Sequence, residues 1–327
     1  MRGFAYAGAF EVLDSLQVLK GIERVGGTSA GAIQACLLSV GYTPCEILQL
    51  TAYVKPQEFN DGSWFFGTGV HRLKKDFGYY KGEKISQWLH DLIAAKTGNG
   101  DITLGELHRL RATKGYKDLY ITGTDLTYQC LRIFSYEQYP HMRVKDAVRI
   151  SLSIPLYFKP VLIDDCGAVY DKKVEGVSLH LMVDGGALSN YPLFLFDSSK
   201  YVSGIHLPRN VMMENPETLG LMMESPEQIA YNRQHAGNAP IRIKSLKDYM
   251  KAVYVTLIDK VSPEAANTSQ WKRTVTISTL NHSGRVRKLP KKVVEELLES
   301  GREGARRFFG SDAKKPLIAG ANTSVTT

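Results

Sequence analysis

The feature that most constrains this chain is a serine set among small residues, in the stretch VGGTSAGAI at positions 25–33. Gly27 and Gly31 flank Ser29 in the pattern G-x-S-x-G, which suits a tight turn from a strand into a helix with the serine hydroxyl exposed. The same glycines suit an ordinary turn or an anion-binding loop at the start of a helix. The pentapeptide alone therefore leaves open whether Ser29 attacks a substrate.

The residues around this serine predict a strand, a turn and a helix. The sequence IERVGG before it is typical of a short strand, and residues 30–42 are apolar almost all round until Gly41, which predicts a buried helix. Further upstream, apolar residues from Phe4 to Leu19 recur at spacings of three and four, and the run closes at Gly21, as in another helix. Ser29 thus has the strand-turn-helix context that a nucleophile needs.

Composition favours an ordinary globular protein with a sizeable core. Of the 327 residues, 43% are hydrophobic and 23% charged, and no internal repeat or linker is visible, so a single domain with insertions is expected. Lysine and arginine exceed the acidic residues by 41 to 33, which gives a net charge of +8 that attracts anions. The basic residues are scattered and no nucleic-acid module is visible, so lipid headgroups are the better match than nucleic acid.

The remaining segments have their own predicted structures. We expect a glycine- and aromatic-rich loop or cap that exposes apolar surface at 61–84, where Trp64, Phe65, Phe66, Phe77, Tyr79 and Tyr80 could meet an acyl chain or membrane or simply pack on the core. We expect helices at 84–98, 143–155 and 291–309, a strand or hairpin at 117–135, strands within 161–183 and at 273–279, and an unstructured tail.

One aspartate is a candidate base for Ser29. Asp184 ends an apolar strand and is followed by Gly185 and Gly186, which leave space and free backbone N–H groups, although an ordinary Asp-Gly turn fits the same residues. The 8 histidines lie outside glycine-rich or strand-end settings, so we interpret them as surface or packed residues. A Ser-His-Asp triad is not supported.

Three separated stretches, taken together, resemble the patatin-like phospholipases. They are MRGFAYAGAFEVLD at the start, GTSAGA around Ser29 and VDGGALSNYP around Asp184. SLSIPLYFKP between the last two, and LLESGREGARRFF near the end, resemble further segments of that family. Order and spacing agree from Met1 to about Phe309, a far more specific match than any one motif.

The resemblance implies a Ser-Asp dyad, in which Ser29 attacks an ester carbonyl and Asp184 is the base. It implies a three-layer α/β fold with a central, mostly parallel sheet between helices, over a domain of residues 1–310 with a flexible tail at 311–327. The implied substrate is a phospholipid or another acyl lipid, with contact to a peripheral membrane surface, no nucleic acid, and no metal or organic cofactor. Because a free aspartate is a weak base for a serine hydroxyl, the site must raise the pKa of Asp184 or use a short, direct hydrogen bond.

One departure from the family concerns its oxyanion site. The family builds this site from a Gly-Gly-Gly-x-Arg/Lys-Gly loop after a first strand, and only Met1, Arg2 and Gly3 match the end of that loop. We expect Arg2 and Gly3 to contribute to oxyanion or anion binding. Without the triple glycine, either the N-terminus is incomplete or catalysis is impaired.

Two alternative functions remain open. In the first, the protein is a catalytically impaired relative of the same fold that binds lipid or a partner. A phosphate-binding loop is a weak third reading because no lysine follows the glycines. We expect a cytoplasmic or peripheral membrane location, and the N-terminus leaves a secreted effector open.

Overall fold

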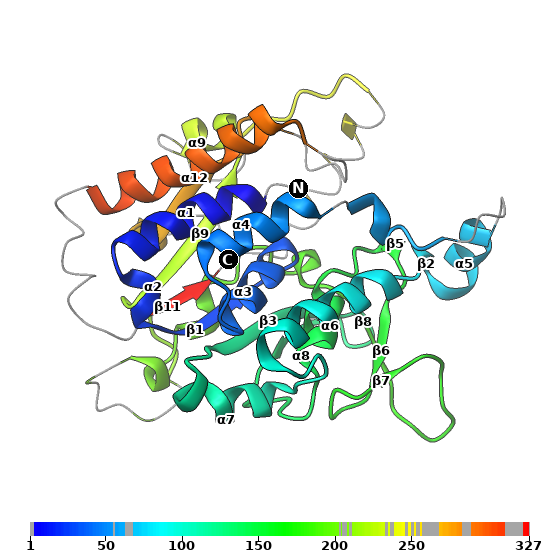
Figure 1. The fold of residues 1–327 in the computed structure, drawn as a ribbon. Helices are drawn as coiled ribbons and strands as arrows, with labels where there is room; N and C mark the ends of the chain where they lie inside the picture. The colour runs from blue at the N-terminus through cyan, green and yellow to red at the C-terminus, as the bar shows by residue number, and fades with distance from the viewer. Residues whose placement is uncertain are drawn as a thin grey trace.

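The computed structural model describes residues 3–54, 56–62, 68–202, 204, 208, 211–232, 235, 239–245, 248–249, 252, 256, 268–282, 289–310 and 323–326. Among these residues, nine strands form one sheet in the order β10-β9-β11-β1-β3-β8-β6-β7, with β4 beside β3 (Figure 1). The strands are β1 (Ile22–Gly27), β3 (Asp118–Asp125), β4 (Cys130–Phe134), β6 (Val161–Ile163), β7 (Val169–Tyr170), β8 (His180–Asp184), β9 (Thr218–Glu224), β10 (Thr274–Ser278) and β11 (Thr323–Thr326). A separate two-stranded sheet pairs β2 (Gly78–Tyr80) with β5 (Leu156–Phe158).

The large sheet is mixed. Its strands are parallel from β10 through β9, β11 and β1 to β3, and the pairs of β3 with β4 and β8, and of β6 with β7 and β8, are antiparallel. The prediction of a mostly parallel sheet therefore describes only the half from β10 to β3. Short connections favour antiparallel neighbours, and β3 to β4 and β6 to β7 are joined in this way.

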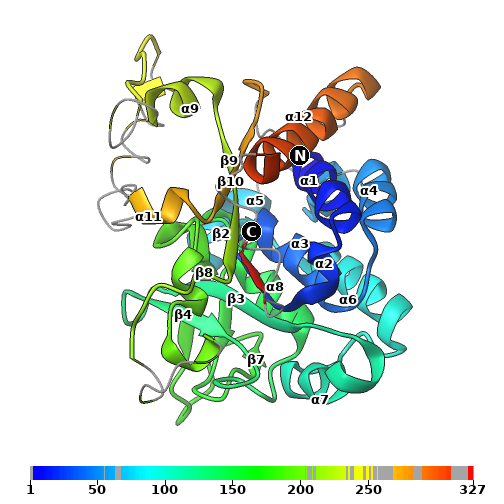
Figure 2. The same cartoon turned by 90° about the vertical axis from the view of Figure 1, so that its left-hand side faces the viewer.

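The described helices surround this sheet. They are α1 (Gly3–Ser15), α2 (Val18–Gly21), α3 (Ala30–Ser39), α4 (Pro44–Tyr53), α5 (Thr68–Asp76), α6 (Glu83–Thr97), α7 (Leu104–Lys114), α8 (Val144–Ser151), α9 (Pro226–Asn232), α11 (Thr268–Trp271) and α12 (Lys291–Gly310), with short 3-10 turns η1 (Pro56–Phe59), η2 (Gly185–Ala187), η3 (Leu193–Phe196) and η4 (Ser199–Tyr201). Figure 2 shows α1, α3, α4 and α12 on one side of β9, β10 and β11. Within the described part of the chain, no helix is both long enough and apolar enough to cross a membrane.

Glycines let α1 and α12 touch backbone to backbone. A Cβ added at Gly8 would lie 2.0 Å from the carbonyl oxygen of Leu298, and one at Gly301 would lie 1.9 Å from that of Ala5. Larger side chains at these positions would push the helices apart. The close approach buries the apolar face of α12 that the sequence predicts, including Leu297, Leu298, Ala305 and Phe308.

Helix ends differ from the sequence prediction where local conformation intervenes. The predicted helix from Phe4 to Leu19 is divided into α1 and α2 at Gln17, whose φ of 60° is left-handed. The helix predicted to stop at Pro155 already ends at Ser151, and Leu152 follows it with φ −96° and ψ 0°. By contrast, α6 ends at Gly98, as predicted, with φ 77°.

The segment at 61–84, predicted as a loop or cap, contains a helix and a strand. An added Cβ at Gly69 would lie 2.5 Å from the ring of Tyr79, and one at Gly78 would lie 2.2 Å from the backbone nitrogen of Lys159. These two glycines therefore permit α5 and β5 to pack closely on β2. Trp64, Phe65 and Phe66 lie outside the described residues.

The end of the chain contributes a strand to the sheet. Residues 323–326, which the sequence analysis assigns to an unstructured tail, form β11 between β1 and β9, with Val325 opposite Val25. Without β11, the backbone N–H and C=O groups of β1 and β9 on the sides that it covers would lack partners within the sheet. β-branched residues such as Thr323 and Val325 also favour a strand. Residues 311–322 and 327 lie outside the described residues.

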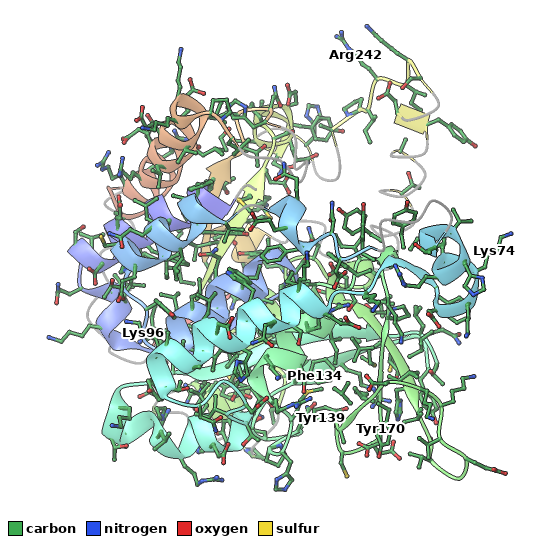
Figure 3. The ribbon with its side chains drawn as sticks, turned by 45° about the vertical axis from the view of Figure 1, so that its right-hand side comes forward. Lys74, Lys96, Phe134, Tyr139, Tyr170 and Arg242 are labelled. Carbon is green, nitrogen blue, oxygen red and sulfur yellow. The ribbon has the colours of Figure 1, made fainter. Side chains whose placement is uncertain are left out.

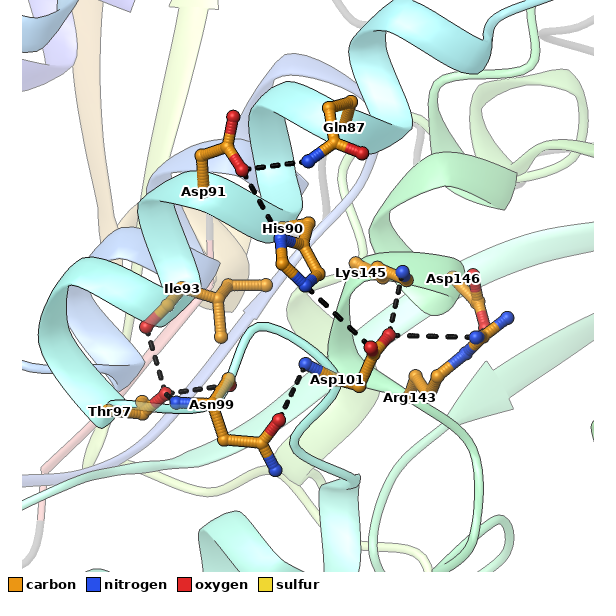
Figure 4. Close-up of polar contacts among 10 residues, drawn as sticks. All are labelled: Gln87, His90, Asp91, Ile93, Thr97, Asn99, Asp101, Arg143, Lys145 and Asp146. Atoms are coloured by element: carbon orange, nitrogen blue, oxygen red, sulfur yellow. Dashed lines mark hydrogen bonds and ion pairs between the residues drawn. The ribbon is translucent and has the colours of Figure 1, made fainter.

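A polar cluster anchors the start of α8 (Figure 4). Asp101 lies in the loop before α7. Its Oδ1 is 2.6 Å from Nζ of Lys145 and 3.5 Å from Nη1 of Arg143, and its Oδ2 is 3.6 Å from Nε2 of His90. The hydrogen bond from Lys145 holds the pKa of Asp101 below its usual value. Such partly exposed pairs contribute little stability. They link the loop before α7 to the start of α8, whose other end reaches the candidate site.

Candidate active site

Ser29 occupies a strained turn between β1 and α3. Its φ of 53° and ψ of −118° are unusual for a residue with a side chain. Gly27 ends β1 before this turn, and Gly31, in the first turn of α3, donates its N–H to the carbonyl oxygen of Thr28 at 2.8 Å. The strand-turn-helix geometry predicted from G-x-S-x-G is therefore present.

Asp184 reaches the same place from the other side of β3. The parallel pair β1–β3 sets Gly27 opposite Ile121, and the antiparallel pair β3–β8 sets Asp184 opposite Gly123. The chain beyond Gly27 continues for two residues to Ser29, so both side chains arrive at one level of β3. The aspartate thus enters from an antiparallel strand, not from a parallel one.

The two side chains contact each other directly. Oγ of Ser29 donates a hydrogen bond to Oδ2 of Asp184 at 2.8 Å, and the N–H of Gly186 donates to Oδ1 of Asp184 at 2.8 Å. An added Cβ at Gly185 would lie 2.4 Å from Oγ1 of Thr122, so a glycine is required for the chain to pass β3 here. The carboxylate is therefore fixed with one oxygen on the backbone and the other on the serine.

Burial determines the proton affinity of this carboxyl group. Only 7% of Asp184 is exposed. Burial raises the pKa of Asp184 to about 6, against smaller lowering effects of the Gly186 N–H and the Ser29 hydroxyl. The carboxylate is a stronger base than a free aspartate and is still largely ionised at neutral pH.

The end of α8 holds the backbone of both residues. The N–H of Ser29 donates to Oγ of Ser151 at 2.9 Å, and the N–H of Asp184 donates to the carbonyl oxygen of Ser153 at 3.0 Å. Ser151 and Ser153 are fully buried. Both serines belong to the stretch SLSIPLYFKP, but their roles are not visible in the sequence, because Ser29 and Asp184 lie more than 30 positions away from them in the chain.

The start of α3 offers a hydrogen-bond donor next to Ser29. Ala30 is exposed and is the first residue of α3, where a backbone N–H has no acceptor within the helix. The positive end of the helix dipole also favours negative charge at this position. Gly3, at the start of α1, lies near α3, because an added Cβ would be 3.2 Å from Nε2 of Gln34. Arg2 lies outside the described residues.

Histidine is not among the described partners of the two residues. Within the described part of the chain, the side chains of Ser29 and Asp184 bond to each other and to the N–H of Gly186, and their backbone N–H groups donate to Ser151 and Ser153. His180, on the same strand as Asp184, is held instead between Asp125 and Asp165, at 2.8 Å from each.

A family model described as patatin-like phospholipase matches residues 1–197. The chain belongs to this family. Among its relatives, the uncharacterized protein YqhO of Bacillus subtilis (strain 168) is 34% identical over 210 residues, which are 61% of this chain and 65% of YqhO. The probable lipid hydrolase 463L of Invertebrate iridescent virus 6 is 27% identical over 195 residues, 59% of each chain.

The patatin-like fold also has a solved counterpart. The crystal structure of VipD from Legionella pneumophila superimposes with a TM-score of 0.53 and 16% identity, and the match covers 95% of this chain and 65% of VipD. At this identity the likeness concerns the fold. The matched regions span about three fifths of the length of the curated relatives and of VipD.

Proposed function

We propose that this patatin-like protein is a serine hydrolase that cleaves fatty acyl esters of lipids such as phospholipids, with Ser29 as nucleophile and Asp184 as base. The observation that carries the proposal is the 2.8 Å hydrogen bond from the Ser29 hydroxyl to a buried carboxylate. Family membership, and the lipid hydrolase among the relatives, support a lipid ester as substrate.

The geometry suits acyl transfer through a covalent intermediate. As Oγ of Ser29 bonds to the ester carbonyl carbon, its proton passes to Oδ2 of Asp184 and the carbonyl oxygen becomes an anion. The N–H of Ala30 is a suitable donor to that oxyanion. Asp184 then gives the proton to the departing alcohol oxygen as the C–O bond breaks. A water molecule repeats the steps on acylated Ser29 and releases the fatty acid.

The surroundings of Asp184 support its role as base without a histidine. A base works best when its pKa lies close to the working pH, and a pKa of about 6 is nearer to neutral than the 3.8 of an ordinary aspartate. The direct hydrogen bond removes the need for a relay between serine and carboxylate. Every proton in these steps moves between the substrate, water and these two side chains.

Hydrolysis of a p-nitrophenyl ester by matched variants tests the proposal. Asp184→Asn keeps the side-chain shape but removes the base, so we expect kcat to fall by about two to four orders of magnitude. Asp146→Asn is the matched control, since Asp146 is also a buried aspartate whose pKa is raised by burial, but it pairs with Arg143.

The control variant should remain close to the parent in kcat. Equal rates in the parent, Asp184→Asn and Ser29→Ala would refute the proposal and favour a relative that binds lipid without cleaving it. Loss of activity in a histidine variant but not in Asp184→Asn would replace the dyad with another base.

A further inference from the structure

An arm made of residues 68–80 and 154–158 projects from the body of the molecule (Figure 1). It consists of α5, β2 and β5 with the residues that adjoin them. The arm exposes large apolar side chains, with relative exposures of 51% for Val70, 56% for Phe77, 42% for Tyr79, 44% for Ile154 and 67% for Leu156. Large exposed apolar residues gathered in one region of the surface mark a binding site.

Two of these residues have an unfavourable backbone conformation. Phe77 has φ 61° and Leu156 has φ 67°, in the left-handed region that bulky residues avoid. The two lie together, because Gly78 pairs with Leu156 in the small sheet. Both the exposure and the backbone conformation are unfavourable for the free protein, which points to a function for the two side chains.

The same region is basic. Residues 70–84 contain five lysines and arginines but only two acidic residues. Lys74, Lys75, Lys81 and Lys84 are exposed, and Figure 3 shows Lys74 at the outer edge of α5. Exposed apolar groups beside excess positive charge match a bilayer with anionic headgroups.

A buried arginine ties the arm to the candidate site. Arg149, on α8, donates to the carbonyl oxygens of Lys81, Gly82 and Lys159 at 2.9, 3.0 and 3.1 Å. It also donates to Oγ of Ser153, whose own carbonyl accepts the N–H of Asp184. Burial lowers the pKa of Arg149 to about 10, so the guanidinium stays charged at neutral pH. The chain directly after each part of the arm, at Lys81, Gly82 and Lys159, is therefore linked through Arg149 and Ser153 to the backbone of Asp184.

We propose that this arm is a docking surface for an anionic lipid bilayer, with Phe77 and Leu156 entering the interface and the lysines contacting headgroups. This proposal rests on the proposed function, because docking would serve to bring lipid esters to Ser29. Bilayer binding itself requires no catalysis, so it can be measured separately.

Vesicle sedimentation of the full chain carrying Ser29→Ala tests the proposal, because that variant leaves the lipid intact. We expect it to bind vesicles of phosphatidylcholine with phosphatidylserine more tightly than vesicles of phosphatidylcholine alone. Adding Phe77→Asn and Leu156→Asn should lower binding about tenfold, since asparagine tolerates left-handed backbone while the apolar contacts are lost. Adding Lys74→Glu and Lys75→Glu instead should lower binding to the anionic vesicles about fivefold per residue.

Leu280→Asn is the matched control, because Leu280 is also an exposed leucine with left-handed backbone, at φ 50°, but lies after β10. It should bind vesicles as the Ser29→Ala parent does. Unchanged binding of the Phe77→Asn, Leu156→Asn variant at unchanged thermal stability would overturn the proposal, as would an equal loss in Leu280→Asn. Sedimentation velocity tests whether the arm instead mediates contact between copies of the chain. Self-association that the two asparagines abolish, without vesicle binding, would make the arm a contact between copies and overturn lipid docking.

If vesicles bind as expected but the ester assay detects no hydrolysis, only the proposed function fails. If the ester is hydrolysed but the arm variants bind vesicles unchanged, only the docking surface fails.

Discussion

The hydroxyl of Ser29 donates a 2.8 Å hydrogen bond to Asp184 although 155 positions separate the two residues in the chain. The contact exists because β1 and β8 pair with opposite edges of β3, in opposite directions, and end at one level of it. Two strand ends of the sheet therefore fix the pair, and the end of α8 holds its backbone on a third side. A contact set by the sheet in this way should be rigid, and the predictions below depend on it.

The pH dependence of ester hydrolysis should report the carboxyl group of Asp184. Burial raises its pKa to about 6, and only the ionised form can accept the serine proton. We expect kcat/KM to be half-maximal near that pH and to fall about tenfold for each pH unit below it. A profile that is flat from pH 7 down to pH 5 would argue against an aspartate base with raised pKa.

Stability should show the opposite trend with pH. Because the folded state raises the pKa of Asp184 from 3.8 to about 6, it binds this proton more tightly than the unfolded chain does. That contribution to the free energy of unfolding is fully present below pH 4 and is lost as the pH rises through about 6.

Asp184→Asn should therefore be more stable than the parent at pH 8, by up to about 3 kcal/mol, and the advantage should vanish near pH 4. Urea unfolding of both proteins at the two pH values measures this difference. A difference that does not change with pH would mean that folding does not raise the pKa of Asp184.

Ser151 should act as a positioning residue for the serine turn. Its Oγ accepts the N–H of Ser29, whose backbone conformation is unfavourable, and the loss of such a bond costs about 1 kcal/mol. We expect Ser151→Ala to lower kcat by about tenfold with KM nearly unchanged, because the substrate still binds while the nucleophile is less well held.

The matched control for this variant is Ser39→Ala. Ser39 is equally buried and bonds to the carbonyl oxygen of Cys36, within α3. A general loss of stability would lower the fraction of folded enzyme, and so the apparent kcat, in both variants alike, whereas a loss confined to Ser151→Ala reports the turn at Ser29. A normal kcat in Ser151→Ala would show that the turn keeps its geometry without this bond.

The sequence predicts the pairing of Ser29 with Asp184 better than it predicts the structure around them. Glycines beside Ser29 and Asp184 reveal both residues, since each needs close backbone approach, and local periodicity predicts α3, α6 and β1. The antiparallel direction of β8 is not visible locally, because the same apolar strand fits either direction. The contacts of Ser151 and the insertion of β11 between β1 and β9 also depend on distant partners. Gln17 and Phe77 adopt left-handed backbone conformations although neither is a glycine. The sequence therefore does not predict the division between α1 and α2 or the shape of the arm.

Covalent labelling of the full chain by a fluorophosphonate, located by peptide mass spectrometry, tests the central claim most directly. The reagent bonds to an activated serine, so the account predicts a single label, on Ser29. Labelling should be absent in Ser29→Ala, at least a hundredfold slower in Asp184→Asn and unchanged in Asp146→Asn. Labelling that persists at full rate in Ser29→Ala or in Asp184→Asn would contradict the assignment of this pair as nucleophile and base.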